Sequence, residues 1–174
     1  MAPGPAYFPR LLFEVRTNRM STPLQPKEFF TGTWKGEGEL IPHPLLRWLI
    51  PREQICFSSQ TIWLSDMVWA VKERFEFSSG NVIARTMLVE MVGPDQLHVT
   101  ADDMPSGADI ILHQKGFRFT PYYIRCYHRG RKWRLWCKDE NSIDEDGMIH
   151  DTIKMFFLGF PVATMRLAVV RTSS

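Results

Sequence analysis

The sequence predicts an all-β protein, an antiparallel up-and-down β-barrel of about eight to ten strands. Two observations lead to this prediction. From residue 31 onward, short segments of alternating apolar and polar residues are separated by Gly, Pro, Asn and Asp. Between Trp69 and Trp136, no stretch has the apolar spacing of an amphipathic helix. Closing such a series of strands into a barrel removes the unpaired edges that an open sheet would expose.

The strand segments follow from this alternation in order along the chain. They are residues 31–40, 55–63, 69–77, 81–91, 96–101, 108–119, 122–128, 131–139, 148–156 and 163–171. A short helical segment is expected only at 44–50, where Pro51 would end it. Residues 1–26 contain five prolines and no sustained periodicity, which predicts a loosely ordered tail. A single barrel domain is then expected over 27–174.

The composition is that of a soluble globular chain, with 44% hydrophobic and 23% charged residues. The net charge of +2 comes from basic residues in the first 26 positions, so the body of the chain is neutral and a nucleic-acid partner is not expected. No apolar run approaches the roughly 18 residues of a membrane span. The three cysteines include no C-x-x-C pair, which predicts reduced, buried thiols and a cytoplasmic protein.

Turn residues fix the register of a first predicted hairpin. Ser78-Ser79-Gly80 suits a three-residue loop, because Gly80 can adopt the left-handed conformation that such a loop needs. Glu73 then lies opposite Arg85 on a face that is otherwise apolar. Two interpretations stay open: the pair recognises the polar end of a ligand in the barrel lumen, or it is a structural ion pair.

A second predicted hairpin turns at Arg129-Gly130. It pairs Cys126 with Trp133, Ile124 with Leu135 and Tyr122 with Cys137. The side chains predicted to line the lumen with Glu73 and Arg85 are Trp69, Val71, Phe75, Met87, Ile124, Trp133 and Leu135.

The segment Gly32-Thr33-Trp34 resembles the G-x-W motif that opens the first strand of the lipocalin and wider calycin barrels. The resemblance implies that Trp34 plugs the floor of the barrel and that a basic residue of the last strand, Arg171, packs across it. Independently of the resemblance, Gly36 and Gly38 leave room for this strand to bend sharply.

Over residues 29–171, the chain also resembles a bacterial family of small lipocalin-like proteins of unknown function, many of them lipoproteins. The matching motifs are Phe29-Phe30-x-Gly32, Glu73-x-Phe75, Ala101-Asp102-Asp103-Met104, Asp139-x-Asn141 and Leu158-Gly159-x-Pro161-Val162-Ala163. The chain lacks the lipidated cysteine of those lipoproteins. The resemblance implies a cup for an apolar molecule and carries no catalytic mechanism.

Other motifs favour structural roles. Residues 102–107 predict a turn at a barrel mouth, and the acidic residues from Asp139 to Asp146 predict a solvated turn, because the ligand positions of a calcium loop are not filled. The five histidines lack the spacing of a zinc site, and the last predicted strand contains no histidine that could bind a haem iron. No metal and no cofactor are therefore expected. The basic and aromatic residues of 122–136 divide between two strand faces.

The leading hypothesis is a binding protein for a small hydrophobic or amphipathic molecule, with residues 42–51 as a lid. One alternative is a cofactor-independent isomerase or cyclase in which Glu73, Asp102 or Asp103 transfers a proton. The other is an interaction domain whose barrel is filled by its own side chains. A lumenal cavity of roughly 300 Å³ or more would separate the first two from the third. The sequence leaves the ligand and the oligomeric state open.

Overall fold

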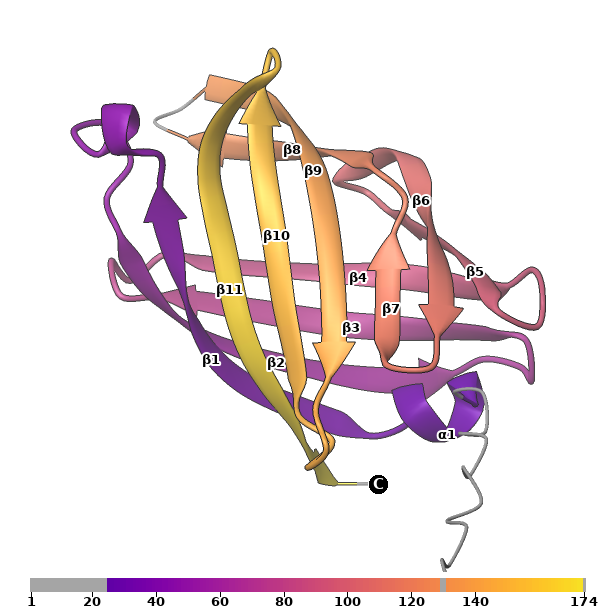
Figure 1. Ribbon diagram of the computed structural model, residues 1–174. Helices are drawn as coiled ribbons and strands as arrows, with labels where there is room; N and C mark the ends of the chain where they lie inside the picture. Colours follow the sequence, from indigo (N-terminus) through magenta and orange to yellow (C-terminus); the bar gives the residue numbers. More distant parts are fainter. Residues whose placement is uncertain (1–24, 129–130, 174) are drawn as a thin grey trace, which may run out of the picture.

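The computed structural model describes residues 25–128 and 131–173, in which one antiparallel sheet curls into a closed barrel (Figure 1). Besides the helix α1 (Pro26–Phe30) and the 3-10 turn η1 (Pro44–Leu46), the described elements are all strands. They are β1 (Thr33–Pro42), β2 (Glu53–Trp63), β3 (Val68–Phe77), β4 (Val82–Met91), β5 (Gln96–Ala101), β6 (Met104–His113), β7 (Gly116–Phe119), β8 (Tyr122–His128), β9 (Arg131–Ile143), β10 (Ile149–Phe157) and β11 (Phe160–Ser173).

The barrel closes through pairing of β1 with β11, while β10 pairs with both β9 and β11. β7 and β8 lie one after the other along the same edge of β9, separated at Thr120 and Pro121. Because proline lacks a backbone N–H, the hydrogen-bond ladder is interrupted there. Taken together, the described strands form the closed ten-stranded antiparallel barrel that the alternating pattern predicts.

Several boundaries differ from the prediction. The expected strand 108–119 is the end of β6 and the whole of β7, joined by a tight turn at Gln114 and Lys115. The expected turn over 102–107 is only two residues long, because β6 already begins at Met104. The backbone at Gly107 has a φ of 62°, and the ladder between β5 and β6 has a register shift nearby, between Val99 and Ala101. Residues 104–107, which the sequence predicts to lie in a turn, are therefore part of strand β6.

The two hairpin registers are confirmed. Glu73 pairs with Arg85 across β3 and β4, and Tyr122 pairs with Cys137 across β8 and β9. β9 runs four residues beyond its predicted end at Asp139. The predicted helix at 44–50 is shorter, a 3-10 turn over Pro44–Leu46.

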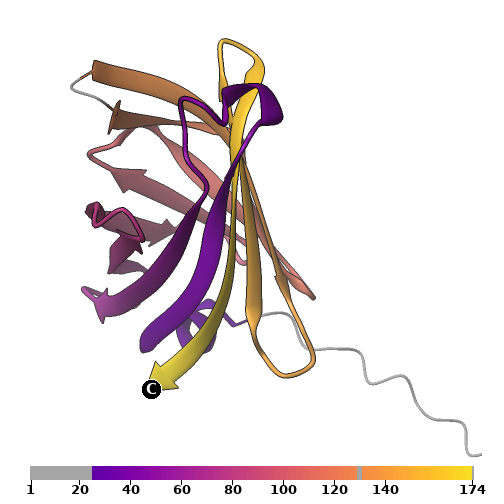
Figure 2. The same ribbon diagram turned by 90° about the vertical axis from the view of Figure 1, so that its left-hand side faces the viewer.

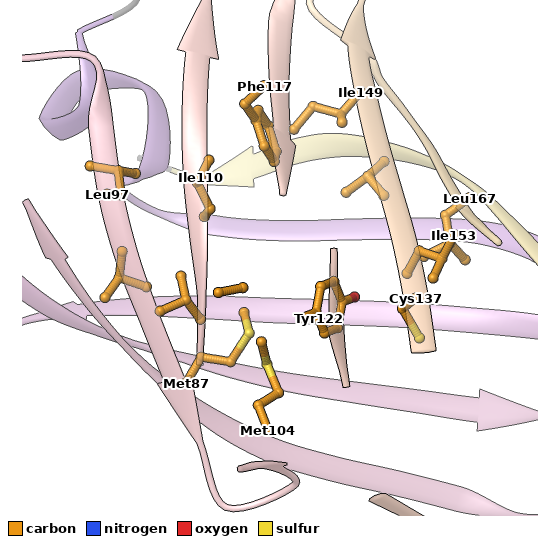
Figure 3. Packing of buried hydrophobic residues seen from close by; sticks show 14 of the residues in the cluster. Met87, Leu97, Met104, Ile110, Phe117, Tyr122, Cys137, Ile149, Ile153 and Leu167 are labelled. Carbon is orange, nitrogen blue, oxygen red and sulfur yellow. The ribbon is translucent and has the colours of Figure 1, made fainter. Parts of the chain in front are cut away.

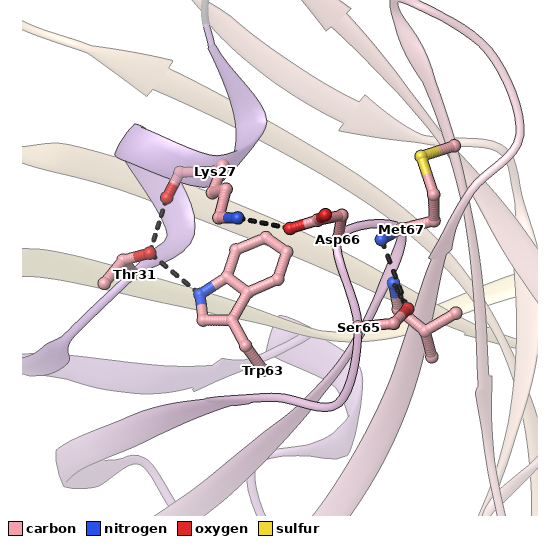
Figure 4. A network of polar contacts seen from close by, with 7 residues as sticks. Lys27, Thr31, Trp63, Ser65, Asp66 and Met67 are labelled. Carbon is pink, nitrogen blue, oxygen red and sulfur yellow. Dashed lines mark hydrogen bonds and ion pairs between the residues drawn. The ribbon is translucent and has the colours of Figure 1, made fainter.

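The helix α1 closes one end of the barrel. Residues 1–24 of the expected tail lie outside the described residues, but its last residue, Pro26, already begins α1. Phe29 packs on Trp34, with ring centroids 5.4 Å apart, and Phe30 stacks on Trp69 at 6.0 Å. The hydroxyl of Thr31 accepts a hydrogen bond from Trp63 Nε1 at 2.8 Å (Figure 4).

An ion pair also fastens α1 to the connection between β2 and β3. Lys27 Nζ lies 2.6 Å from Asp66 Oδ1 and 5.6 Å from the centre of the Trp63 ring (Figure 4). Thr31 Oγ1 in turn donates to the carbonyl of Lys27. A helix of five residues cannot persist by its backbone hydrogen bonds alone, so these contacts and its aromatic side chains hold it in place.

Trp34 and Arg171 lie side by side as the lipocalin resemblance implies. The two residues pair across β1 and β11, and the guanidinium carbon of Arg171 lies 4.9 Å from the centre of the buried Trp34 ring. Gly32, just before β1, has a φ of 107°, which disfavours any side chain. At Gly38, a Cβ atom would lie 1.8 Å from the carbonyl oxygen of Arg166, so only glycine permits the observed approach of β1 to β11.

Candidate functional site

Inside the barrel lies a cavity of about 120 Å³, bounded by inward-facing side chains of most strands and by Phe29 and Phe30 of α1. Its volume is below the range of roughly 300–1,000 Å³ that is common for ligand sites. It is close to the roughly 150 Å³ of an apolar cavity that holds benzene. The cavity is therefore smaller than the size expected above for a binding protein or an enzyme, and much of the lumen is filled by the buried side chains of the barrel itself, several of which Figure 3 shows.

Six of the nine predicted contact residues line this cavity: Trp69, Val71, Glu73, Phe75, Arg85 and Met87. The other three are not among its lining residues. Ile124 and Leu135 pack against the buried core, and Trp133 packs on Phe157 with ring centroids 4.8 Å apart. Alternation identifies the face on which a side chain lies, but not its height along the barrel axis.

Glu73 and Arg85 form a largely buried ion pair in the wall of the cavity. Arg85 Nε donates to Glu73 Oε2 at 2.6 Å. The side chain of Arg85 is 17% exposed and that of Glu73 is 12% exposed. Arg85 Nη1 also donates to Asp103 Oδ2 at 3.4 Å. Burial by itself disfavours the charged guanidinium and is the largest single effect, but the acidic neighbours Glu73, Tyr122 and Asp103 together outweigh it, and the pKa of Arg85 is raised.

A second polar group projects from the opposite part of the wall. Asp139 is 5% exposed and accepts hydrogen bonds from the Tyr122 hydroxyl at 3.2 Å and from Asn141 Nδ2 at 2.8 Å. Burial raises the pKa of Asp139 to about 6, although both hydrogen bonds favour its ionised form. The prediction that Asp139 belongs to a solvated turn is wrong, because β9 continues through it and carries it into the lumen.

Asp139 and Asp151 of β10 form a carboxyl pair, hydrogen-bonded to each other. Burial raises the pKa of Asp151 well above its usual range, and the negative charge of Asp139 raises it further. Burial thus favours a protonated form of the pair, and the two carboxyl groups titrate together rather than one by one. The same burial raises the pKa of the nearby Tyr122 hydroxyl well above its ordinary value, so this group keeps its proton and donates a hydrogen bond to Asp139.

Some buried polar atoms around the cavity have no hydrogen-bond partner within the described chain. Among them are Trp69 Nε1, Asp151 Oδ1 and Asp103 Oδ1. Trp69 and Asp151 both line the cavity. An unsatisfied buried donor or acceptor costs about 1–3 kcal/mol, so these atoms favour a molecule that offers both an acceptor and a donor.

The lumen also has an excess of acidic groups. Glu73, Asp103, Asp139 and Asp151 surround a single guanidinium, that of Arg85. Even with Asp151 protonated, carboxylates outnumber the cation. Within the described residues, no group of three or more His, Cys, Asp or Glu is arranged to hold a metal ion. This arrangement favours a neutral donor or a positively charged organic group.

Sequence reasoning missed Tyr122, Asp139, Asn141 and Asp151 as site residues. Two of them could have been found from the sequence. Asp139 and Asn141 follow Cys137 at intervals of two residues along the same strand, so their side chains lie on the same inward face. Asp151 has no such local signal, since its position depends on the pairing of β10 with β9.

The predicted lid does not cover the lumen. The connection around η1 lies at the end of the barrel opposite α1, and its Leu45 and Trp48 side chains point into solvent. Cys56, Cys126 and Cys137 are free thiols; the expectation that all three are buried holds for Cys137, whereas Cys126 is half-buried and Cys56 is exposed. In the part of the chain that is described, no helix is long and apolar enough to cross a membrane.

The closed antiparallel barrel with Trp34 and Arg171 at one end is a lipocalin-like fold. Comparison with solved structures agrees. An S-type phycobiliprotein lyase from Guillardia theta aligns with a TM-score of 0.57 at 10% identity, over 87% of this chain and 94% of the lyase. The protein Rv2717c from M. tuberculosis aligns with a TM-score of 0.54 at 12% identity, over 84% of this chain and 94% of its own.

A protein of the DUF3598 family, of unknown function, from Nostoc punctiforme also aligns, with a TM-score of 0.54 at 15% identity. The alignment covers 87% of this chain and 51% of that protein. No protein-family model matches the sequence, and no curated protein matches it in sequence. At these identities the similarity establishes the fold.

Proposed function

We propose that this protein binds a small molecule in the barrel lumen, with the apolar part of the molecule among aromatic side chains and its polar end at the acidic cluster. The observation that carries the proposal is the cavity lined by both Trp69 and Asp151, whose buried Nε1 and Oδ1 atoms have no partner among the described residues. A ligand that satisfies both atoms removes two desolvation penalties.

The geometry favours a particular class of ligand. A cavity of about 120 Å³ admits a molecule of a few heavy atoms. The excess of carboxylates over Arg85 favours an amine or another donor over a carboxylate, which would face Asp139 and Glu73 at close range. Trp69 Nε1 adds one donor for an acceptor atom on the same molecule.

A panel of three small probes tests this function. Isobutylamine, isobutanol and isobutyrate are nearly equal in size and share an isopropyl group, but they differ in charge. We expect isobutylamine to raise the melting temperature of the protein most, isobutanol less and isobutyrate least, because ligand bound only to the folded state stabilises it. The measurement is thermal unfolding at increasing probe concentration.

The control for this panel is the variant Val71→Leu, which adds one methylene group to the cavity wall. It is expected to weaken the effect of isobutylamine while remaining folded. The proposal fails if no probe raises the melting temperature, or if Val71→Leu responds as strongly as the unmodified chain.

One observation favours a second candidate function, a cofactor-independent isomerase or cyclase. The Asp139 and Asp151 pair combines a carboxylate with a protonated carboxyl group beside the cavity, which is the arrangement that proton transfer to and from a bound molecule needs. Of the proton-transfer residues expected from the sequence, Glu73 is held by Arg85, whereas this pair is not neutralised by a cation of its own. The pair is therefore the better candidate for such a role.

A further inference from the structure

The five most exposed large hydrophobic side chains among the described residues all lie at one end of the barrel. They are Leu158 (83% exposed), Trp48 (79%), Leu45 (76%), Phe160 (74%) and Tyr127 (72%). They come from three parts of the chain that are distant in sequence: the connection around η1, strand β8, and the β10–β11 hairpin, in which Leu158 lies in the turn and Phe160 begins β11. This is the end opposite α1 (Figures 1 and 2).

The rim patch, defined as Leu45, Trp48, Leu158 and Phe160, belongs to two adjoining loops. The amide of His43 donates to the carbonyl of Val162 at 2.9 Å, which fastens the η1 connection to the start of β11. Figures 1 and 2 show both loops at this end of the barrel. The patch therefore consists of protruding turns.

Leu158 is not explained by the fold. It has a φ of 49°, the one positive φ that the described residues show outside glycine. Glycine and asparagine are the usual residues in this conformation, and a branched side chain there costs conformational energy. An exposed leucine recovers none of that energy by burial, so its side chain indicates a role outside the folded barrel.

Basic residues accompany the exposed apolar ones. Arg47 precedes Trp48 and is exposed, and Lys132 Nζ lies 5.5 Å from the ring centre of Tyr127. Arg134 covers Tyr123 at 4.1 Å. Among the described residues these three cations have no carboxylate partner; of the acidic residues at this end, Glu39 is paired with Arg52, whereas Glu53 contacts Ser79 and Asp102 is exposed. The end of the barrel thus combines apolar tips with unneutralised positive charge.

We propose that the rim patch docks the barrel onto a lipid bilayer that contains anionic lipids. Leu158, Phe160 and Trp48 insert at the level of the headgroups, where aromatic and apolar side chains are favourable. Arg47, Lys132 and Arg134 lie at the lipid phosphates, where each cation strengthens binding to an anionic surface. Because the docking surface lies outside the lumen, this proposal goes beyond the proposed ligand binding and is independent of it.

Co-sedimentation with vesicles tests the proposal. The unmodified chain is expected to bind vesicles in which about a third of the phosphatidylcholine is replaced by phosphatidylserine, and to bind pure phosphatidylcholine more weakly. Raising the salt to about 1 M, where the Debye length is about 3 Å, is expected to weaken the binding. The variant Leu158→Asn is expected to bind on the order of tenfold more weakly, because one inserted side chain is lost.

Two controls separate this effect from a loss of folding. Leu158→Asn is expected to keep or raise the melting temperature, because asparagine tolerates the positive φ better than leucine does. Leu64→Asn removes a side chain that is 61% exposed at the opposite end, and it is expected to leave vesicle binding unchanged. The proposal is overturned if the unmodified chain does not bind anionic vesicles, or if Leu158→Asn binds as tightly. Dimerisation through the patch without vesicle binding also overturns it.

Discussion

The substitution Arg85→Met is expected to lower the free energy of unfolding by about 3–5 kcal/mol, the cost of leaving a buried partner charge unpaired. The reason is that Glu73, 2.6 Å from the guanidinium, would remain as an uncompensated carboxylate in a largely apolar wall. For a chain of this length, such a loss lowers the melting temperature by about 10 °C. Urea and thermal unfolding followed by circular dichroism measure both quantities.

Strand β3, which carries Glu73, also supplies a matched control. Arg74 and Glu76 also form an ion pair at 2.6 Å, but both side chains are 52% exposed. Arg74→Met is expected to cost less than about 1 kcal/mol, because solvent screens an exposed pair. The double variant Glu73→Leu and Arg85→Met is expected to recover most of the stability lost in Arg85→Met. Equal effects of Arg85→Met and Arg74→Met would show that Glu73 is solvated rather than enclosed.

The protein is expected to lose stability at the carboxyl pair as the pH rises from about 4 toward 8. In the folded state the pKa of Asp139 is raised to about 6 and that of Asp151 is raised further, whereas the ordinary value is 3.8. Above 3.8 the folded chain therefore binds more protons than the unfolded chain, so stability falls with pH through this window. For Asp139 alone the change is roughly 3 kcal/mol.

The variant Asp151→Asn isolates this contribution. Its amide can still donate to Asp139, but it has no proton to lose. Its stability relative to the unmodified chain is expected to grow by up to about 1.4 kcal/mol for each pH unit between pH 5 and pH 7. Asp144→Asn is the control: the pKa of this exposed carboxyl is lowered by a hydrogen bond to His150, so it should show no such gain. Parallel pH profiles for Asp151→Asn and the unmodified chain would contradict the assignment of a shared proton.

Local patterns were sufficient for the strands whose partners are close in sequence. Ser78-Ser79-Gly80 fixes one turn, and the alternation on either side of it places Glu73 opposite Arg85 without any tertiary information. The helix α1 has no such pattern, because a helix of five residues shows no periodicity and depends on the barrel end against which Phe29 and Phe30 pack.

Only part of the candidate site was predictable, because several of its residues come from strands that are distant in sequence. Asp139 stands at the head of a run of acidic residues, and such composition is typical of exposed turns. It is buried because β9 extends to Ile143 and pairs with β10, an outcome of the closed barrel. The same pairing brings Asp151 to Asp139. The size of the cavity likewise depends on how side chains from all parts of the barrel fill the lumen.

Native mass spectrometry tests the central claim, that the lumen holds a small molecule at the polar cluster, most directly. The protein purified without denaturant is expected to carry an added mass of a few heavy atoms, which is released on unfolding. The variant Asp151→Leu, folded by the criterion of its melting temperature, is expected to lose it, because it removes the unpartnered acceptor in the cavity wall. The bare mass of the chain in the unmodified protein, or an unchanged adduct in Asp151→Leu, would contradict the claim.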